Sequence, residues 1–285
     1  MSADQIATNL ALINWTVLAG LAVGSFTVVV LARLRTDATR GFLAFTALCA
    51  TGFGFLAWLS DGALPLPGAS AALGSVASPV VTDPTFEAPR RAALVVFTVL
   101  AAVTTLTIAR GGRGAFVGAA GLAAGLGALL FGALTWGGSP GGVAMLAVQL
   151  LVLALATGGV FAAMILGHWY LVTPKLPEAP LVMVSRRLLW VIAIQVALFV
   201  LWVGIGLGPG STGPFAALVG PYALFVWLRL LVGLVFPLVV SWAALQTART
   251  RSMESATGLL YINVGTIAAG TILAAGLYFG AGLLV

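Results

Sequence analysis

Residues 150–166 read LLVLALATGGVFAAMIL, a run with no charged side chain and no alternation of polar and apolar positions. The run is the centre of a longer apolar segment, 142–173, and a helix that crosses a bilayer needs about 20 such residues. A strand of a membrane barrel would instead alternate apolar and polar residues over about ten positions. The pattern therefore predicts a transmembrane helix.

The whole chain has the composition of an integral membrane protein. Of its 285 residues, 61% are hydrophobic and 7% are charged, against roughly 25% charged in a soluble domain. This excludes a soluble fold and, despite a net charge of +6, a nucleic-acid-binding domain. We predict an all-α polytopic bundle with eight spans. The spans are 6–34, 40–60, 91–110, 114–136, 142–173, 186–208, 221–247 and 256–284.

The basic residues predict the orientation of the spans. One side of the predicted topology carries Arg33, Arg35, Arg40, Arg110, Arg113, Lys175, Arg186, Arg187, Arg249 and Arg251. The other side carries Arg90 and Arg91, and Arg229 lies within a span. Because basic loops stay in the cytoplasm, we expect both termini to face outward across a bacterial cytoplasmic (inner) membrane. The segment 1–5 has no basic residue, so we expect the first span to be retained rather than cleaved.

We expect one transmembrane domain, 1–285, with an irregular outward loop at 61–90. That loop is rich in Pro, Gly, Ser and Ala, which is typical of a cap over the bundle, and a docking surface is the alternative. Spans one to four and five to eight have the same orientation. A parallel duplication with halves 1–136 and 141–285 is therefore a further hypothesis.

Glycines predict one smooth helix face in the fourth span. They lie at Gly114, Gly118, Gly121, Gly125 and Gly132, with separations of 4, 3, 4 and 7 residues. These separations place all five on one face of a helix, where another helix can approach closely. We interpret the face as a packing surface, with hinges in a transporter as the alternative.

Arg229 is the main candidate for a functional residue, because an ionisable group at membrane depth is costly. It lies in the outer half of span seven and either snorkels to the outer headgroups or faces the bundle. In the bundle it would bind an acceptor oxygen from a backbone carbonyl, a lipid phosphate or a quinone carbonyl. Asp61 is the nearest carboxylate that we expect. The other candidates for this outer pocket are Trp227, Gln149, Asn14 and Trp58.

A second group of polar residues is predicted near the cytoplasmic ends of spans five and eight. His168, the single histidine, is either an interfacial residue or a group that exchanges protons near neutral pH. It would form an inner polar pocket with Tyr170, Tyr261, Asn263 and Glu254.

The residue inventory argues against a tightly bound cofactor. One histidine cannot provide bis-histidine ligation of a haem, and Met164 is one turn from His168 on the same helix, so a haem is not expected. We expect no metal site, because too few His, Cys and carboxylate residues share one depth. No Walker motif and no buried Asp for a Ser–His–Asp triad is present, so we do not expect catalysis by this chain alone.

The segment Gly20–Phe26, GLAVGSF, is similar to the glycine-rich first span of the quinone-reactive membrane subunits of the polysulfide reductase and DMSO reductase anchor type. The eight spans and outward termini resemble that family as well. The resemblance implies a subunit without haem that passes electrons between a quinone in the bundle and iron–sulfur or cytochrome partner proteins, with Arg229 as a quinone contact. Two alternatives stay open. One is a secondary transporter or channel for a small solute, and the other is a structural membrane subunit without a site of its own. Membrane lipid is an expected partner of the chain.

Overall fold

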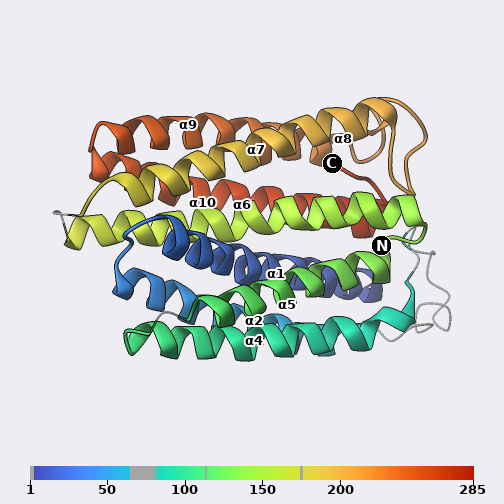
Figure 1. Cartoon of the computed structure of the whole chain (residues 1–285). Coiled ribbons are helices and arrows are strands. Elements are labelled where there is room, and N and C mark those ends of the chain that lie inside the picture. The colour runs from blue at the N-terminus through green and yellow to red at the C-terminus, as the bar shows by residue number, and fades with distance from the viewer. Residues whose placement is uncertain (1–2, 65–79, 81, 113, 174–175) are drawn as a thin grey trace.

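The structure, a computed structural model, describes residues 3–64, 80, 82–112, 114–173 and 176–285. In this part of the chain every regular element is a helix (Figure 1). The long helices are α1 (Ala3–Arg35), α2 (Arg40–Gly62), α4 (Glu87–Ala109), α5 (Ala115–Trp136), α6 (Pro140–Val172), α7 (Ala179–Ile205), α8 (Ala223–Leu230), α9 (Phe236–Arg249) and α10 (Met253–Ala281). Short 3-10 turns, η1 (Pro84–Phe86) and η2 (Ala216–Leu218), lie in the connections, and a π-helical turn, η3 (Leu231–Val235), joins α8 to α9.

Eight of these segments are long and apolar enough to cross a membrane, with α8, η3 and α9 forming one continuous span. The predicted all-α bundle of eight spans is therefore confirmed, and the protein is a multi-pass integral membrane protein. The largest differences from the predicted boundaries are two earlier starts, because α4 begins at Glu87 and α7 at Ala179. Pro89 and Pro180 lie in the first turns of these helices, where the missing N–H of proline costs no i→i−4 hydrogen bond.

The earlier starts of α4 and α7 correct the predicted loops. Arg90 and Arg91 belong to the first turns of α4, and Arg186 and Arg187 lie well inside α7. The predicted spans 91–110 and 186–208 instead place these four arginines where a loop meets a helix. Residues 65–79 and 81 of the predicted cap lie outside the described residues. The part of that segment that is described contains η1, whose first turn is capped by the Asp83 carboxylate.

The helices form two groups of four. In the first, α2 packs against α1 and α4, and α5 packs against α4 and α1. In the second, α7 packs against α6 and α9, and α10 packs against α9 and α6. Figure 1 shows the first group below and the second group above. Both groups use the same chain order around the ring, which is the arrangement that a duplication predicts, and the duplication itself stays a prediction.

The two groups meet where α1 crosses α6. A Cβ atom added to Gly24 would lie 2.7 Å from the carbonyl carbon of Ala154 and 2.9 Å from Cα of Gly158. A Cβ added to Gly158 would in turn lie 2.5 Å from Cα of Gly24. The two backbones are therefore in direct contact, and only glycine fits at this crossing.

The predicted glycine face of α5 is confirmed for four of its five residues. Gly118, Gly121, Gly125 and Gly132 are buried, and the last three contact aromatic rings of α1 and α4. An added Cβ would meet the ring of Phe26 at Gly121, that of Phe97 at Gly125 and that of Trp15 at Gly132. Gly114 is the exception, because it precedes α5 in a left-handed conformation with φ of +52°. The face thus accommodates large rings as well as close helix packing.

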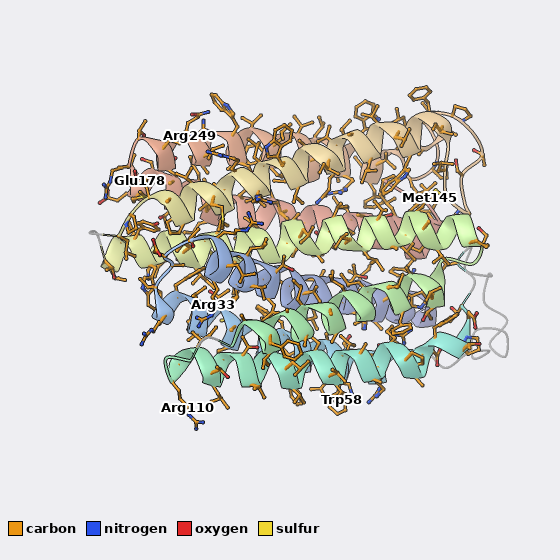
Figure 2. The ribbon with its side chains drawn as sticks, viewed as in Figure 1. Arg33, Trp58, Arg110, Met145, Glu178 and Arg249 are labelled. Atoms are coloured by element: carbon orange, nitrogen blue, oxygen red, sulfur yellow. The ribbon has the colours of Figure 1, made fainter. Side chains whose placement is uncertain are left out.

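Arginines gather at the end of the bundle where α1, α4, α6 and α9 end and where α2, α5, α7 and α10 begin, which we call the basic end. Figure 2 shows Arg33, Arg110 and Arg249 there, with Trp58 and Met145 toward the other end. The start of α1 and the end of α10 lie at that other end, which we call the terminal end (Figure 1). The charge asymmetry seen in the sequence is therefore an asymmetry between the two ends of the bundle.

Candidate functional site

Arg229 lies inside the second helix group. Its side chain is 3% exposed, and Arg229 and Val226 are the buried residues of α8. Arg229 comes six positions after Ala223, the first residue of α8. Arg229 therefore lies about 9 Å along the span from its start at the terminal end. Of the two orientations that the sequence left open, the structure therefore has the one in which Arg229 faces the bundle.

The backbone of span seven provides the first partner of Arg229. Pro237 has no N–H to donate to the Gly233 carbonyl in the usual i→i−4 pattern. Nη1 of Arg229 donates to that carbonyl oxygen instead, over 3.1 Å. The turn in between, Leu231–Val235, is π-helical, and such turns are frequent at functional sites. Arginine, glycine and proline spaced by four residues thus form one local unit.

Gln195 of α7 provides the second partner. Its Oε1 accepts from Nη2 of Arg229 over 2.8 Å, and its Nε2 donates to the Val152 carbonyl of α6 over 2.9 Å. A hydrogen-bonded chain therefore runs from span seven through α7 to α6. Both contacts of Arg229 are to neutral oxygens. Among the described residues no carboxylate pairs with its charge, and its Nε has no hydrogen-bond partner.

Gly233 and Gly270 make room for the guanidinium. A Cβ added to Gly270 would lie 2.7 Å from Cα of Gly233 and 2.8 Å from Nη1 of Arg229. The backbone of α10 therefore touches the π-helical turn beside the arginine. One residue further along α10, the hydroxyl of Thr271 is 2.7 Å from that of Thr157 on α6. The region around Arg229 is thus closed by direct contacts between helices.

Gln149 of α6 is the other buried outer candidate in the helix group of Arg229. It is buried, and its Oε1 has no hydrogen-bond partner in the described part of the chain. It lies three residues, about one helical turn, from Val152, whose carbonyl ends the Arg229–Gln195 chain. The second group therefore contains a buried donor, Nε of Arg229, and a buried acceptor, Oε1 of Gln149, without partners among the described residues.

Asp61 pairs with a different arginine, which corrects the expectation that it would serve Arg229. Its Oδ2 is 2.7 Å from Nε of Arg90, and both side chains are buried in the first helix group. The indole N–H of Trp15 donates to the same Oδ2 over 2.9 Å, and Nη1 of Arg90 donates to the Thr135 hydroxyl over 3.0 Å. Sequence reasoning missed this site because it placed Arg90 in a loop.

Aromatic rings enclose the Asp61–Arg90 pair. The guanidinium carbon of Arg90 lies 4.7 Å from the ring centre of Trp136 and 5.9 Å from that of Trp15, and these two rings pack edge to face. The hydroxyl of Tyr278, from the second group, donates to the Trp136 carbonyl. Each buried charge here has an opposite charge or a π-face as its partner. This arrangement is suited to holding helices together.

The five predicted outer residues are divided between the two groups. Asn14 donates to the Ser60 hydroxyl next to Asp61, and Trp58 lies under the guanidinium of Arg91 at 5.1 Å. Trp227 is exposed on α8 and donates to the Leu218 carbonyl. Asn14 and Trp58 thus belong to the surroundings of Arg90, whereas Gln149 and Arg229 lie in the second group.

The five predicted inner residues are not linked to one another by any described contact. His168, Glu254 and Tyr261 are exposed on the helix surfaces. The Tyr170 hydroxyl donates to the Pro177 carbonyl, and the Asn263 amide donates to the Ser241 hydroxyl over 2.7 Å. Helices α6 and α10 do pack together, and Gly167 contacts Thr257 near this end. Each of the five side chains therefore has its own surroundings.

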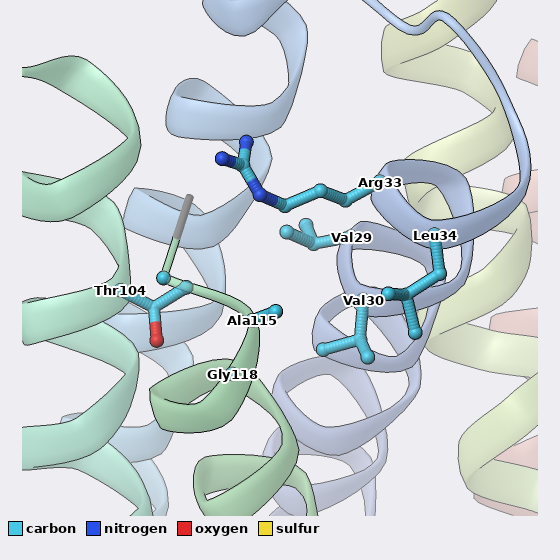
Figure 3. Close-up of a pocket in the computed structure, with 8 residues that line it drawn as sticks. Val29, Val30, Arg33, Leu34, Thr104, Ala115 and Gly118 are labelled. Atoms are coloured by element: carbon cyan, nitrogen blue, oxygen red, sulfur yellow. The ribbon is translucent and has the colours of Figure 1, made fainter. Parts of the chain in front are cut away.

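A small crevice separates α1 from α4 and α5 near the basic end. Its volume is about 10 Å³, and Figure 3 shows Val30, Arg33 and Thr104 around it. That volume is about the space of one water molecule, so the crevice is a packing gap. The described residues also contain no group of three or more His, Cys, Asp or Glu that could hold a metal ion.

No protein-family model matches the chain, and no curated protein is significantly similar to it.

Proposed function

We propose that this integral membrane protein binds a quinone beside Arg229 and serves as the membrane subunit of an electron-transfer complex. One observation carries the proposal. Arg229 is a buried cation that contacts two neutral oxygens and keeps a further N–H, at Nε, without a partner in the described structure. A ligand with an acceptor oxygen would satisfy that donor, and a quinone carbonyl is such an acceptor.

The surroundings of α8 favour a ligand that dissolves in the bilayer. Leu224, Phe225, Trp227 and Leu228 are exposed on the outer side of this helix, so they face lipid in a membrane. Arg229 lies on the same short helix as these exposed side chains. A quinone would approach laterally past them, whereas a water-soluble solute would need a polar route along the bundle.

Redox centres would lie on partner proteins in this proposal. The described chain consists almost entirely of helices that cross the membrane, with little mass outside them. Iron–sulfur or cytochrome proteins are the partners that the proposed role requires. By the positive-inside rule we place the basic end in the cytoplasm of a bacterial cell and both termini outside.

A second candidate, a transporter for a small anion, has its own support in the π-helical turn. π-Helical turns are frequent at functional sites, and η3 departs from α-helical geometry within span seven, two residues after Arg229. The arginine would then neutralise an anionic solute. The two candidates differ in whether a quinone stays bound after purification and in whether the protein moves a solute across a membrane.

The test begins with affinity purification from the native membrane in a mild detergent. The bound proteins are identified by mass spectrometry, and extracted quinones are quantified by chromatography. We expect quinone in near one-to-one amount and co-purified redox subunits. A solitary, quinone-free protein that moves an anion into liposomes would overturn the proposal in favour of the transporter.

Variants of Arg229 separate a binding role from a packing role. In Arg229→Leu we expect the quinone to be lost together with some thermal stability, because the Gly233 carbonyl and Gln195 Oε1 lose their donor. Arg229→Lys keeps the charge but cannot reproduce the planar donor set, so we expect weak retention. A purely structural arginine would show lower stability with unchanged quinone content, so the quinone content decides between the two roles. Arg91→Leu, at an exposed arginine near the terminal end, is the matched control.

A further inference from the structure

An open groove lies at the basic end, away from Arg229 and from the Asp61–Arg90 pair. Its volume is about 630 Å³. It is lined by Arg35 and Thr36 at the end of α1 and by a stripe of α7 that runs from Ala179 to Trp190. Such a volume is in the range of sites that bind small molecules or lipid headgroups.

The α7 side of the groove is one helix face that carries both charge and apolar surface. Arg186 and Arg187 lie four and three residues before Trp190, so the three side chains are neighbours on that face. Val182 and Met183 continue the face toward the start of α7. Trp190 is 63% exposed and lies eleven residues into α7, so the face runs from the start of this helix into its apolar part.

The charge in the groove is unbalanced. Three arginines, Arg35, Arg186 and Arg187, line it, and no carboxylate does. The nearest acidic residues along the chain are Asp37, which is exposed in the loop after α1, and Glu178, which pairs with Arg251 over 3.4 Å. An anion is therefore the ligand that the groove would attract. Arginine binds phosphate oxygens through two parallel N–H donors, so phosphate suits it well.

We propose that the groove binds one anionic phospholipid, with its headgroup phosphate between the three arginines and its acyl chains running past Trp190 into the membrane. Two features select a lipid over a free anion. The groove opens at the basic end of the bundle, and its far end is the exposed Trp190, which lies eleven residues into the apolar helix α7. Basic pockets between helices at the cytoplasmic side are the usual sites for anionic lipids. This proposal is independent of any ligand at Arg229.

The experiment uses the full chain, delipidated in mild detergent, and counts bound lipid by native mass spectrometry. Phosphatidylglycerol, phosphatidylcholine and inorganic phosphate are the three probes. We expect one phosphatidylglycerol to bind at least tenfold more tightly than phosphatidylcholine, with no competition from millimolar phosphate. Equal binding of the two lipids would overturn the proposal. Effective competition by phosphate would identify a free-anion site and would overturn it as well.

Two double variants remove the same charge from the same end of the bundle. Arg186→Gln/Arg187→Gln changes the groove, whereas Arg110→Gln/Arg249→Gln changes exposed arginines outside it. We expect about 30-fold weaker phosphatidylglycerol binding in the first and unchanged binding in the second. Equal losses in both would mean a general charge effect and would overturn the site. If the first variant is not monodisperse, Arg35→Gln replaces it, with an expected loss of about fivefold, and no loss would be the contrary result.

Discussion

Arg90 and Arg229 are buried to the same extent, each 3% exposed, but within the described structure only Arg90 contacts a carboxylate. Each arginine lies on the third span of its helix group and bonds to a side chain of the second span, which is Asp61 for Arg90 and Gln195 for Arg229. The first pair is neutral as a unit, whereas the second retains a positive charge. This difference is the physical basis for assigning a structural role to one site and a binding role to the other.

The Asp61–Arg90 pair should be essential for stability. Asp61→Asn leaves the Arg90 charge buried without its partner, and we expect the free energy of unfolding to fall by about 3–5 kcal/mol. Thermal unfolding in detergent measures the effect. Asp83→Asn, near the same end, is the control, because an asparagine can still cap η1. Equal unfolding temperatures for Asp61→Asn and the wild type would contradict the role that we assign to the pair.

The exposed ion pair at the basic end should matter little. Glu178 and Arg251 are 3.4 Å apart, and both side chains are solvent-accessible. Because water and salt screen such a pair, Glu178→Gln should change the free energy of unfolding by no more than about 1 kcal/mol. The same unfolding assay tests this, and a loss comparable to that of Asp61→Asn would refute it.

The contact of Gly270 with Gly233 should not tolerate a methyl group. In Gly270→Ala the new Cβ would collide with the backbone of η3 and with Nη1 of Arg229, so we expect a destabilisation of about 1–3 kcal/mol. Gly265→Ala on the same helix is the matched control. Nothing lies within 4 Å of its added Cβ, and its effect should stay within about 1 kcal/mol. Similar unfolding temperatures for the two variants would mean that the close approach is not required.

The α1–α6 crossing should hold the two helix groups together. Gly158→Ala would drive a methyl group into the backbone of Gly24, and we expect the groups to separate locally and become sensitive to protease. Limited proteolysis in detergent, with Gly127→Ala as a control at an open position, measures this. Unchanged protease resistance of Gly158→Ala would argue against the crossing.

The orientation in the membrane can be tested with single cysteines. Cys49, the one cysteine of the chain, is first replaced by alanine, and cysteine is then introduced at exposed Thr212 or Ser252. With the basic end in the cytoplasm, a maleimide that cannot cross membranes should label Thr212→Cys in intact cells and should label Ser252→Cys only after lysis. The reverse pattern would invert the proposed topology.

The sequence by itself determined the number and type of the elements. An uninterrupted apolar run such as 150–166 has one low-energy form in lipid, because its backbone must pair within the segment, and a helix does this. The glycine spacing of α5 likewise predicted the buried glycine face that the structure shows. The burial of Arg229 had a readable signal too, since Gly233 and Pro237 follow it at four-residue intervals.

Only the tertiary structure decided which polar groups meet. Helices that are apolar on every side carry little periodic signal for their rotation or their neighbours, so no pattern separated Arg90 from Arg229 as the partner of Asp61. The start of α4 at Glu87 turned Arg90 from a loop residue into a buried one. Gln195 is a polar residue within an apolar run of the sequence, but its link to Arg229 depends on the packing of α7 beside span seven. Such pairings depend on how the helices pack against one another, so the sequence of a single helix does not determine them.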